Sequence, residues 1–132
     1  MQISGLQKLT LIDYPKKLAC TIFLQGCNFR CGFCHNPELV LPGRIAEKYS
    51  AEQVLEFLQS RKQYLEAVCI TGGEPLLDPE LLTFIEASKP LAIWLSLIQM
   101  AAILGYCKKP WKKILLITLQ WTSSHAKMIM TC

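Results

Sequence analysis

The last 46 residues of this 132-residue chain contain no aspartate or glutamate. All ten acidic residues lie at or before Glu86, whereas six lysines and all three tryptophans follow it. The first 86 residues therefore carry a formal charge of −2, the remainder carries +6, and the net charge is +4. Because the lysines after Glu86 are scattered and no arginine accompanies them, the basic charge does not predict a nucleic-acid-binding surface.

Two further features are missing from the sequence. No basic stretch followed by an apolar run opens the chain, so we expect no secretory signal and a cytoplasmic location. Without export, the seven cysteines do not predict a disulfide framework. The chain also has no second Cys-x2-Cys pair, which a structural zinc site usually needs.

Three cysteines are present at a distinctive spacing, Cys-x3-Cys-x2-Cys, at Cys27, Cys31 and Cys34. Three thiolates on one loop can bind three irons of a [4Fe–4S] cluster, and the fourth iron then stays open to a substrate or cofactor. A zinc site is an alternative, although His35 lies too close to Cys34 to complete a tetrahedron easily. Residues 31–35 also match Cys-x-x-Cys-His, the covalent haem motif, which needs export and leaves Cys27 unused. The remaining alternative is that the three cysteines are structural.

A second motif, Thr71-Gly72-Gly73-Glu74-Pro75, follows the apolar run 67–70. The run predicts a short buried strand that ends at the paired glycines. Glycines at a strand end let a ligand approach the backbone closely. The Glu74 carboxylate can then bind a cationic or amine-bearing ligand.

The remaining pattern predicts alternating strands and helices. We expect a strand over 19–24, a helix over 51–62 after a Ser-x-x-Gln capping box, and a strand over 67–71. A second helix should begin at Asp78-Pro79, with Asp78 as N-cap and an apolar face of Leu81, Leu82 and Ile85. Residues 9–17 should form a small hairpin that turns at Tyr14-Pro15. This order predicts an α/β fold with a parallel sheet and ligands at the carboxyl ends of its strands.

Together the two motifs resemble those of the radical S-adenosylmethionine superfamily. The flanking segments 5–7, 11–15, 23–27 and 34–37 are similar to those of anaerobic ribonucleoside-triphosphate reductase activating proteins, which are glycyl-radical activases akin to pyruvate formate-lyase activating enzymes. The resemblance covers residues 3–89. It departs at Lys16, where we expect relatives to have glycine, and a turn should tolerate Lys16 if its φ stays negative.

The resemblance implies an oxidoreductase that cleaves S-adenosylmethionine reductively to methionine and a 5′-deoxyadenosyl radical, which takes a hydrogen atom from a glycine of a partner enzyme. The implied cluster ligands are Cys27, Cys31 and Cys34, and the implied cofactor-binding residues are Phe33, Gly72, Gly73, Glu74 and Pro75. Gly72 to Glu74 would hold the amino end of the cofactor's methionine, and Phe33 would lie near its adenine, through its backbone. Cluster and cofactor carry the hard chemistry, and the protein binds and orients them.

The implied partners are a glycyl-radical enzyme such as anaerobic ribonucleoside-triphosphate reductase and a ferredoxin or flavodoxin as electron donor. Neither nucleic acid nor a membrane is expected as a partner. Two alternatives stay open. One is another radical S-adenosylmethionine reaction, such as that of deazapurine-forming synthases, and the other is an inactive truncated fragment that binds an iron–sulfur cluster without turnover.

The change in composition predicts a boundary near Lys89. We expect residues 1–89 to be the N-terminal part of the domain, an incomplete partial (βα) barrel. Residues 90–132 should be an atypical basic, apolar tail read from a shifted frame, which would pack poorly and expose Ile93, Trp94 and Ile98. Residues 90–107 carry no formal charge. They are either a marginal membrane span or a buried soluble segment.

Overall fold

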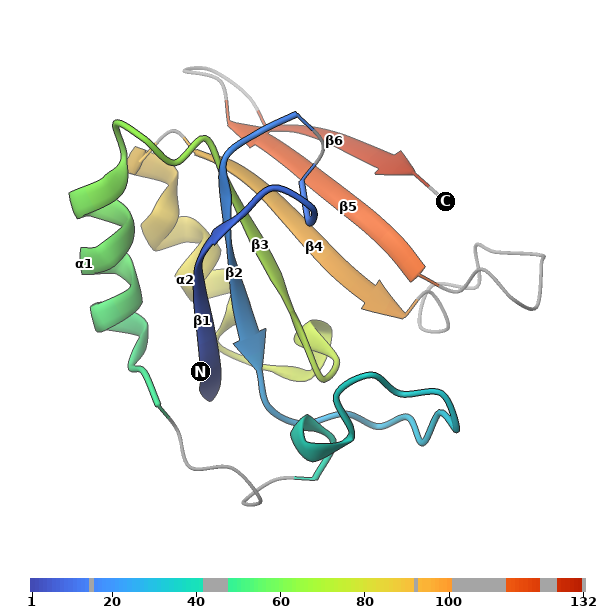
Figure 1. The fold of residues 1–132 in the computed structure, drawn as a ribbon. Coiled ribbons are helices and arrows are strands. Elements are labelled where there is room, and N and C mark those ends of the chain that lie inside the picture. The colour runs from blue at the N-terminus through green and yellow to red at the C-terminus, as the bar shows by residue number, and fades with distance from the viewer. Residues whose placement is uncertain (15, 42–47, 92, 101–113, 122–125, 132) are drawn as a thin grey trace.

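The computed structural model describes residues 1–14, 16–41, 48–91, 93–100, 114–121 and 126–131, with side chains described as far as Leu97. Within these residues, six strands form one mixed sheet whose spatial order follows the sequence (Figure 1). The strands are β1 (Ile3–Thr10), β2 (Ala19–Leu24), β3 (Ala67–Gly72), β4 (Trp94–Met100), β5 (Ile114–Trp121) and β6 (Ala126–Thr131). The helices are α1 (Ala51–Arg61) and α2 (Leu81–Ser88), with short 3-10 turns η1 (Pro37–Leu39), η2 (Pro75–Leu77) and η3 (Lys89–Leu91).

The central part of the sheet is the predicted strand–helix alternation. β2, β3 and β4 are parallel and are joined by α1 and α2, whereas β1, β5 and β6 pair antiparallel with their neighbours. The α/β class and the strands at 19–24 and 67–71 are confirmed, but the sheet is mixed rather than wholly parallel. Parallel neighbours need a crossover connection, which is why each of these pairs encloses a helix.

The start of α1 shows why its sequence predicted a helix. The backbone N–H of Gln53 donates to Ser50 Oγ at 3.2 Å, and the backbone N–H of Ser50 donates to Gln53 Oε1 at 2.9 Å. This reciprocal pair satisfies two backbone donors that a helix start leaves open. Val54 and Leu58 then follow one turn apart and are both fully buried.

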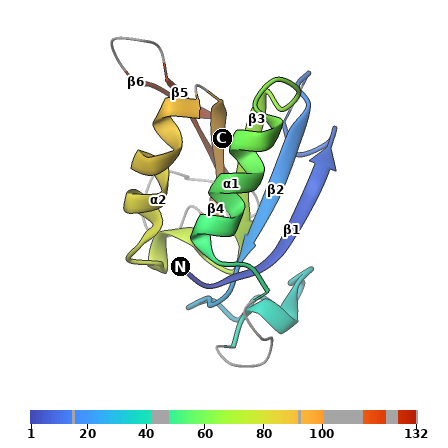
Figure 2. The same cartoon turned by 90° about the vertical axis from the view of Figure 1, so that its left-hand side faces the viewer.

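Both helices cover the same face of the sheet, as the two views show (Figures 1 and 2). Alternate residues of each central strand point to this face, as the twofold period of a strand requires. They form the main core with residues of both helices: Ile22, Leu24, Val68, Ile70, Leu95, Leu97, Val54, Leu58, Phe84 and Ile85. Ile93 also belongs to this core. The expectation that Ile93 is exposed is therefore wrong, because β4 continues the sheet beyond Lys89.

The opposite face of the central strands has smaller side chains, among them Ala19, Ala67 and Cys69. The connection between β1 and β2 covers the amino ends of these strands. Its Tyr14 is buried, and the rings of Tyr14 and Trp94 meet edge to face with centroids 6.3 Å apart. Trp94 is half-buried rather than exposed, and its partner Tyr14 comes from a distant part of the sequence, before β2.

Three further details of the N-terminal part and α2 differ from expectation. Among the described residues of 9–17 only Leu9 and Thr10 lie in a strand, and that strand is β1, which pairs antiparallel with β2, so the expected separate hairpin is not seen there. Lys16 has a φ of +64°, so the condition under which a turn should tolerate this residue, a negative φ, is not met. In α2 the N-cap is Glu80, and Leu82 is 73% exposed while Phe84 joins Leu81 and Ile85 in the core.

The uncharged segment 90–107 lies partly outside the described residues. Its described portion includes η3 and strand β4. Across the parts of the chain that the structure describes, no helix has the length and apolar character needed to cross a membrane. The side chain of Ile98 lies outside the described residues.

Candidate metal and cofactor site

The loop that carries the three cysteines, residues 27–34 (the cysteine loop), begins just past the carboxyl end of β2 (Figure 1). The chain leaves β2 after Leu24 and comes back beside Gly26 at Leu39. The backbone N–H of Gly26 donates to Leu39 O at 2.7 Å, and that of Cys27 donates to Val40 O at 3.1 Å. Leu39 is buried. These two bonds hold together the two chain segments at the base of the cysteine loop.

The three thiols of the loop are free and accessible to different degrees. Cys27 and Cys31 are half-buried and Cys34 is exposed. The second half of the loop is closed by a hydrogen bond from Cys34 N–H to Cys31 O at 3.1 Å, and Phe29 N–H points at Cys27 Sγ at 3.4 Å. Hydrogen bonds to sulfur are one of the means by which proteins tune iron–sulfur clusters.

Among the described residues, no three Cys, His, Asp or Glu side chains lie close enough together to hold a single metal ion. A [4Fe–4S] cluster makes a different demand, because each thiolate binds its own iron. Three free thiols on one loop match that donor set in number and chemistry. The residues present therefore fit a cluster better than they fit a single zinc ion.

Two other cysteines show what an unsuitable thiol looks like in this fold. Burial raises the pKa of Cys20 to about 12. Burial, followed by the nearby charge of Asp13, raises the pKa of Cys69 to about 12. Metal ligation needs the thiolate, so these two core thiols are poor ligands. Cys69 instead donates to Asp13 O at 3.2 Å.

The second motif lies beside the base of the cysteine loop. The N–H of Gly73 donates to Leu24 O at 2.9 Å, and the N–H of Glu74 donates to Gly26 O at 2.8 Å. These bonds continue the pairing of β2 and β3 past the ends of both strands. The two motifs, far apart in sequence, thus share one backbone junction.

The paired glycines are explained by that junction. A Cβ on Gly73 would lie 1.9 Å from Gly26 O, and one on Gly72, whose φ is +121°, would lie 2.3 Å from Leu24 O. The space that a side chain would need is filled by the backbone that follows β2. The sequence suggested room for a ligand here, whereas the close neighbour is the chain itself.

The other predicted cofactor residues differ in exposure. Glu74 is 1% exposed, and its carboxylate accepts from Leu76 N–H at 3.5 Å as the N-cap of η2. Pro75 is fully buried beside it. Phe33, on the cysteine loop, is 78% exposed. The structure thus places Gly72 to Pro75 in a packed turn and Phe33 in solvent.

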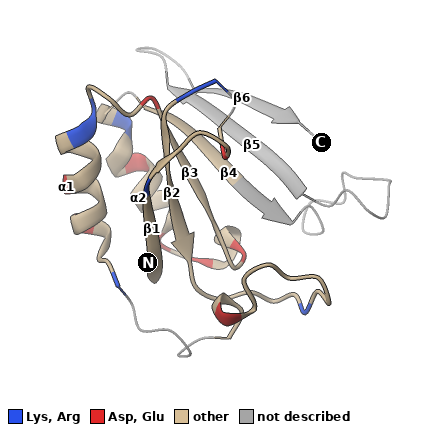
Figure 3. Ribbon diagram, viewed as in Figure 1, with Lys and Arg blue, Asp and Glu red and all other residues tan. Residues whose placement is uncertain are grey.

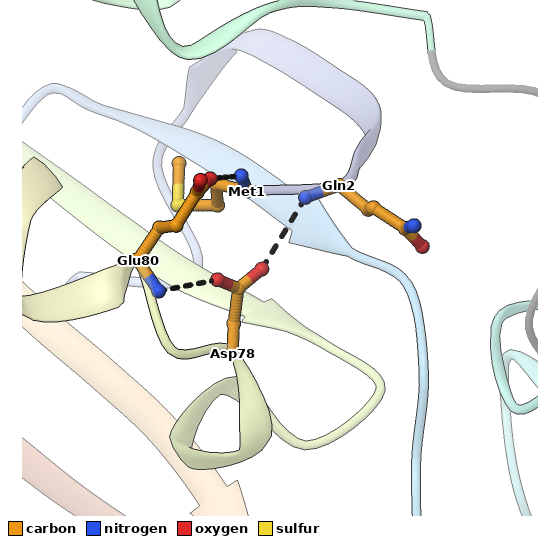
Figure 4. A network of polar contacts seen from close by, with 4 residues as sticks. All are labelled: Met1, Gln2, Asp78 and Glu80. Carbon is orange, nitrogen blue, oxygen red and sulfur yellow. Dashed lines mark hydrogen bonds and ion pairs between the residues drawn. The ribbon is translucent and has the colours of Figure 1, made fainter.

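A cavity of about 490 Å³ opens next to Cys27. Its lining comes from the residues after β2, the connection between η2 and α2, and the first two residues of the chain. Asp78 organises one wall, because its carboxylate accepts from Gln2 N–H at 3.3 Å and from Glu80 N–H at 2.9 Å (Figure 4). The Glu80 carboxylate also pairs with the amino group of Met1.

Sequence reasoning did not assign Asp78 or Glu80 to the site. Figure 3 shows acidic positions on the segment that follows β3, close to the loop that follows β2. The available signal was topological, since ligands of parallel sheets bind beyond the carboxyl ends of the strands. Both acidic residues follow such an end.

Comparison with known proteins identifies the family. A model of the radical SAM superfamily matches residues 21–121. The chain is 38% identical over 81 residues to a glycyl-radical enzyme activating enzyme of Methanocaldococcus jannaschii, a match that covers 59% of this chain and 31% of the relative. It is 35% identical over 86 residues to the pyruvate formate-lyase-activating enzyme of Clostridium pasteurianum, covering 61% and 35%.

The chain spans about a third of the length of these relatives. The superfamily match includes the cysteine loop, the Gly-Gly-Glu-Pro motif and β4. Its members use a [4Fe–4S] cluster and S-adenosylmethionine. By its motifs, its βαβ core and this match, the chain belongs to the radical SAM superfamily.

Proposed function

We propose that this chain supplies the cluster- and cofactor-binding part of a glycyl-radical activase. The observation that supports the proposal most strongly is the junction at which Gly73 and Glu74 bond to Leu24 and Gly26. It brings the cofactor motif to the base of the loop that carries three free thiols. A cofactor that binds both a cluster iron and the Gly-Gly-Glu turn needs this proximity.

In this proposal Cys27, Cys31 and Cys34 ligate the cluster, and the turn from Gly72 to Pro75 holds the amino end of S-adenosylmethionine. The buried Glu74 carboxylate holds η2 in place and so fixes the orientation of that turn. The backbone of Phe33 lies near the adenine. When bound, cluster and cofactor together supply the radical chemistry that removes a hydrogen atom from a glycine of the partner.

The proposed partner is an anaerobic ribonucleoside-triphosphate reductase, and the proposed electron donor is a ferredoxin or flavodoxin. Support for a glycyl-radical enzyme as target comes from the relatives named for activating such enzymes. Support for the reductase comes from segments 11–15 and 34–37 of the sequence. The parallel strands β2 to β4 would be the first part of a partial (βα) barrel, with further strands completing the pocket.

The cluster proposal is tested by anaerobic reconstitution of the full chain with iron and sulfide. We expect one oxygen-sensitive [4Fe–4S] cluster per chain, and its loss on changing Cys27, Cys31 or Cys34 to Ala. Cys20→Ala and Cys69→Ala are matched controls that should retain the iron, because their thiols are buried and protonated. Stoichiometric zinc without iron would contradict the proposal.

The cofactor proposal is tested by electron paramagnetic resonance of the reduced cluster. Added S-adenosylmethionine should change the spectrum, because it binds the open iron. Glu74→Gln keeps the size of the buried side chain and should weaken this change while leaving the iron content intact. Release of 5′-deoxyadenosine distinguishes an active enzyme from a chain that binds the cluster without turnover, and a product from another substrate would indicate a different radical reaction.

We also propose that residues 1–89 and 90–132 differ in origin, with the second segment read from a shifted frame. The absence of acidic residues after Glu86 and the clustering of all three tryptophans support this. β4 lies past the proposed boundary and pairs with β3. The proposal therefore concerns the reading frame of the gene and not the position of β4 in the sheet. The coding DNA tests it. Reading the DNA with a shift of one nucleotide near codon 89 should give a longer chain that contains acidic residues. Early stop codons in both shifted frames would refute the proposal.

A further inference from the structure

The two halves of the cysteine loop are held in different ways. Between Cys31 and Cys34 a backbone hydrogen bond closes the turn. Within residues 27–31, all of which the structure describes, no hydrogen bond joins backbone to backbone. The longer Cys-x3-Cys half must therefore be shaped by side chains or left without internal support.

Besides the bond from Phe29 N–H to Cys27 Sγ, the contacts within this half come from Arg30. Its Nη1 donates to Cys27 O at 2.8 Å and to Phe29 O at 2.7 Å. A guanidinium Nη carries two hydrogens, so one nitrogen can serve both carbonyls. An exposed arginine normally points its head group into water, whereas here the nitrogen is used inside the loop.

We propose that Arg30 is a positioning residue for the cluster, which it serves by clamping the backbone between Cys27 and Cys31. This inference rests on the proposed cluster site and adds a residue to which no role is otherwise assigned. The clamp fixes the carbonyl of one ligand and the residue before the arginine, so it sets the spacing of the first two thiolates. Groups that orient metal ligands from outside typically change metal affinity by about 10- to 100-fold when removed.

Arg30 also places a permanent positive charge in the loop, because a guanidinium stays protonated. Net charge near a cluster is one determinant of its reduction potential. A cation in the loop favours the reduced, more negative cluster. Removing the charge should therefore lower the midpoint potential, an effect that loop shape alone does not predict.

The test compares Arg30→Met, Arg30→Lys and the control Arg61→Met in the full chain after anaerobic reconstitution. Arg61 ends α1 and is exposed, so it matches the substitution away from the loop. Iron release to a chelator should be about tenfold or more faster for Arg30→Met than for the unchanged chain. Arg30→Lys should fall between them, and Arg61→Met should match the unchanged chain. The midpoint potential should drop for Arg30→Met and stay nearly constant for Arg30→Lys.

The outcomes separate this inference from the cluster proposal. If the unchanged chain takes up no iron, both are overturned. If it takes up iron but Arg30→Met releases it at the same rate and with the same potential, only the role of Arg30 is overturned. Urea unfolding of each variant without iron checks the fold, and Arg30→Lys provides the result if Arg30→Met fails to fold.

Discussion

The amino ends of β2 and β3 and their carboxyl ends are held by different kinds of contact. At the amino ends, Tyr14 packs on Trp94, and Lys17 lies 5.1 Å from the Trp94 ring centroid and 3.3 Å from Glu66. At the carboxyl ends, the backbones meet directly, and the side chains that follow are thiols, an arginine and exposed aromatic or acidic groups. The amino ends are closed by packed and paired side chains, whereas at the carboxyl ends the hydrogen bonds of the junction run from backbone to backbone.

The difference indicates where stability and function reside. Side-chain contacts at the amino ends bury apolar surface and pair charges, so changes there should alter the free energy of unfolding and spare the cluster. At the carboxyl ends the thiols of the cysteine loop are not used in the junction, which depends on glycine and main-chain hydrogen bonds. Changes there should alter ligand binding, except where they invade the junction itself.

Gly73→Ala should have the largest effect, because it breaks the junction. Its Cβ would lie 1.9 Å from a backbone oxygen that cannot move without displacing β2. We expect a loss of about 3 kcal/mol or more in the free energy of unfolding, measured by urea denaturation, together with loss of cluster uptake. Gly32→Ala is the matched control, since no atom lies within 4 Å of its added Cβ. An equal loss for Gly32→Ala would mean that the junction is not the cause.

Trp94→Ala should destabilise the amino ends without touching the site. It removes a half-buried ring, its edge-to-face contact with Tyr14 and its cation–π contact with Lys17. We expect a loss of about 2 kcal/mol on urea unfolding. Trp94→Phe keeps a ring and should lose about half as much, and both variants should bind iron as the unchanged chain does. Altered iron content would show that the two ends are not separable.

Alkaline pH should weaken the fold through its core thiols. Their pKa values are about 12 in the folded chain and about 9 when exposed, so between these limits only the unfolded chain releases the protons. This contribution to stability is complete below pH 9 and is lost as the pH rises toward 12. Each thiol should cost roughly 1.4 kcal/mol per pH unit in this window. The free energy of unfolding should therefore fall less between pH 8 and pH 10 for Cys20→Ala than for the unchanged chain. An equal fall for both would refute the prediction.

Lys16→Gly should have the smallest effect, and it should be stabilising. Lys16 lies in the left-handed region at a φ of +64°, where a side chain is strained and glycine is not. We expect a gain of about 1 kcal/mol on urea unfolding. Lys8→Gly, within β1, is the control and should lose about 0.5–1 kcal/mol, because glycine in a strand costs entropy. Equal losses for both would remove strain at Lys16 as the explanation.

The sequence carried enough information for the elements whose signals are local. β2 and β3 were predicted because both are continuous apolar runs that end at glycine. The start of α1 followed from Ser50 and Gln53, whose hydrogen bonds are made within one turn. The position of both motifs at strand ends then follows, which is the part of the candidate site that sequence reasoning placed.

Features that depend on distant contacts were not predicted. β1 contains Gly5 and has irregular register at two points along β2, so it shows no clean alternation. The need for Gly73 arises from Gly26 O, far away in the sequence. The residues next to Lys16 do not give the sign of its φ, although the glycine expected there in relatives is the residue that favours a positive φ. Ile93 looked exposed because its neighbours in the sheet were not recognised. The roles of the cysteines and of Phe33 stay predictions until iron and cofactor binding are measured.

The base of the cysteine loop is closed independently of the residues within the loop. Two hydrogen bonds, from Gly26 and Cys27 to Leu39 and Val40, close the loop at its base, and the buried Leu39 anchors it there. Residues 28–38 lie outside the core. The entropic cost of closing a loop grows slowly with its length. A longer or chemically different loop could therefore connect the same two ends without disturbing the strands. The strand pair β2 and β3 keeps its structure whichever loop follows β2, so this loop is a suitable segment for transplantation between proteins.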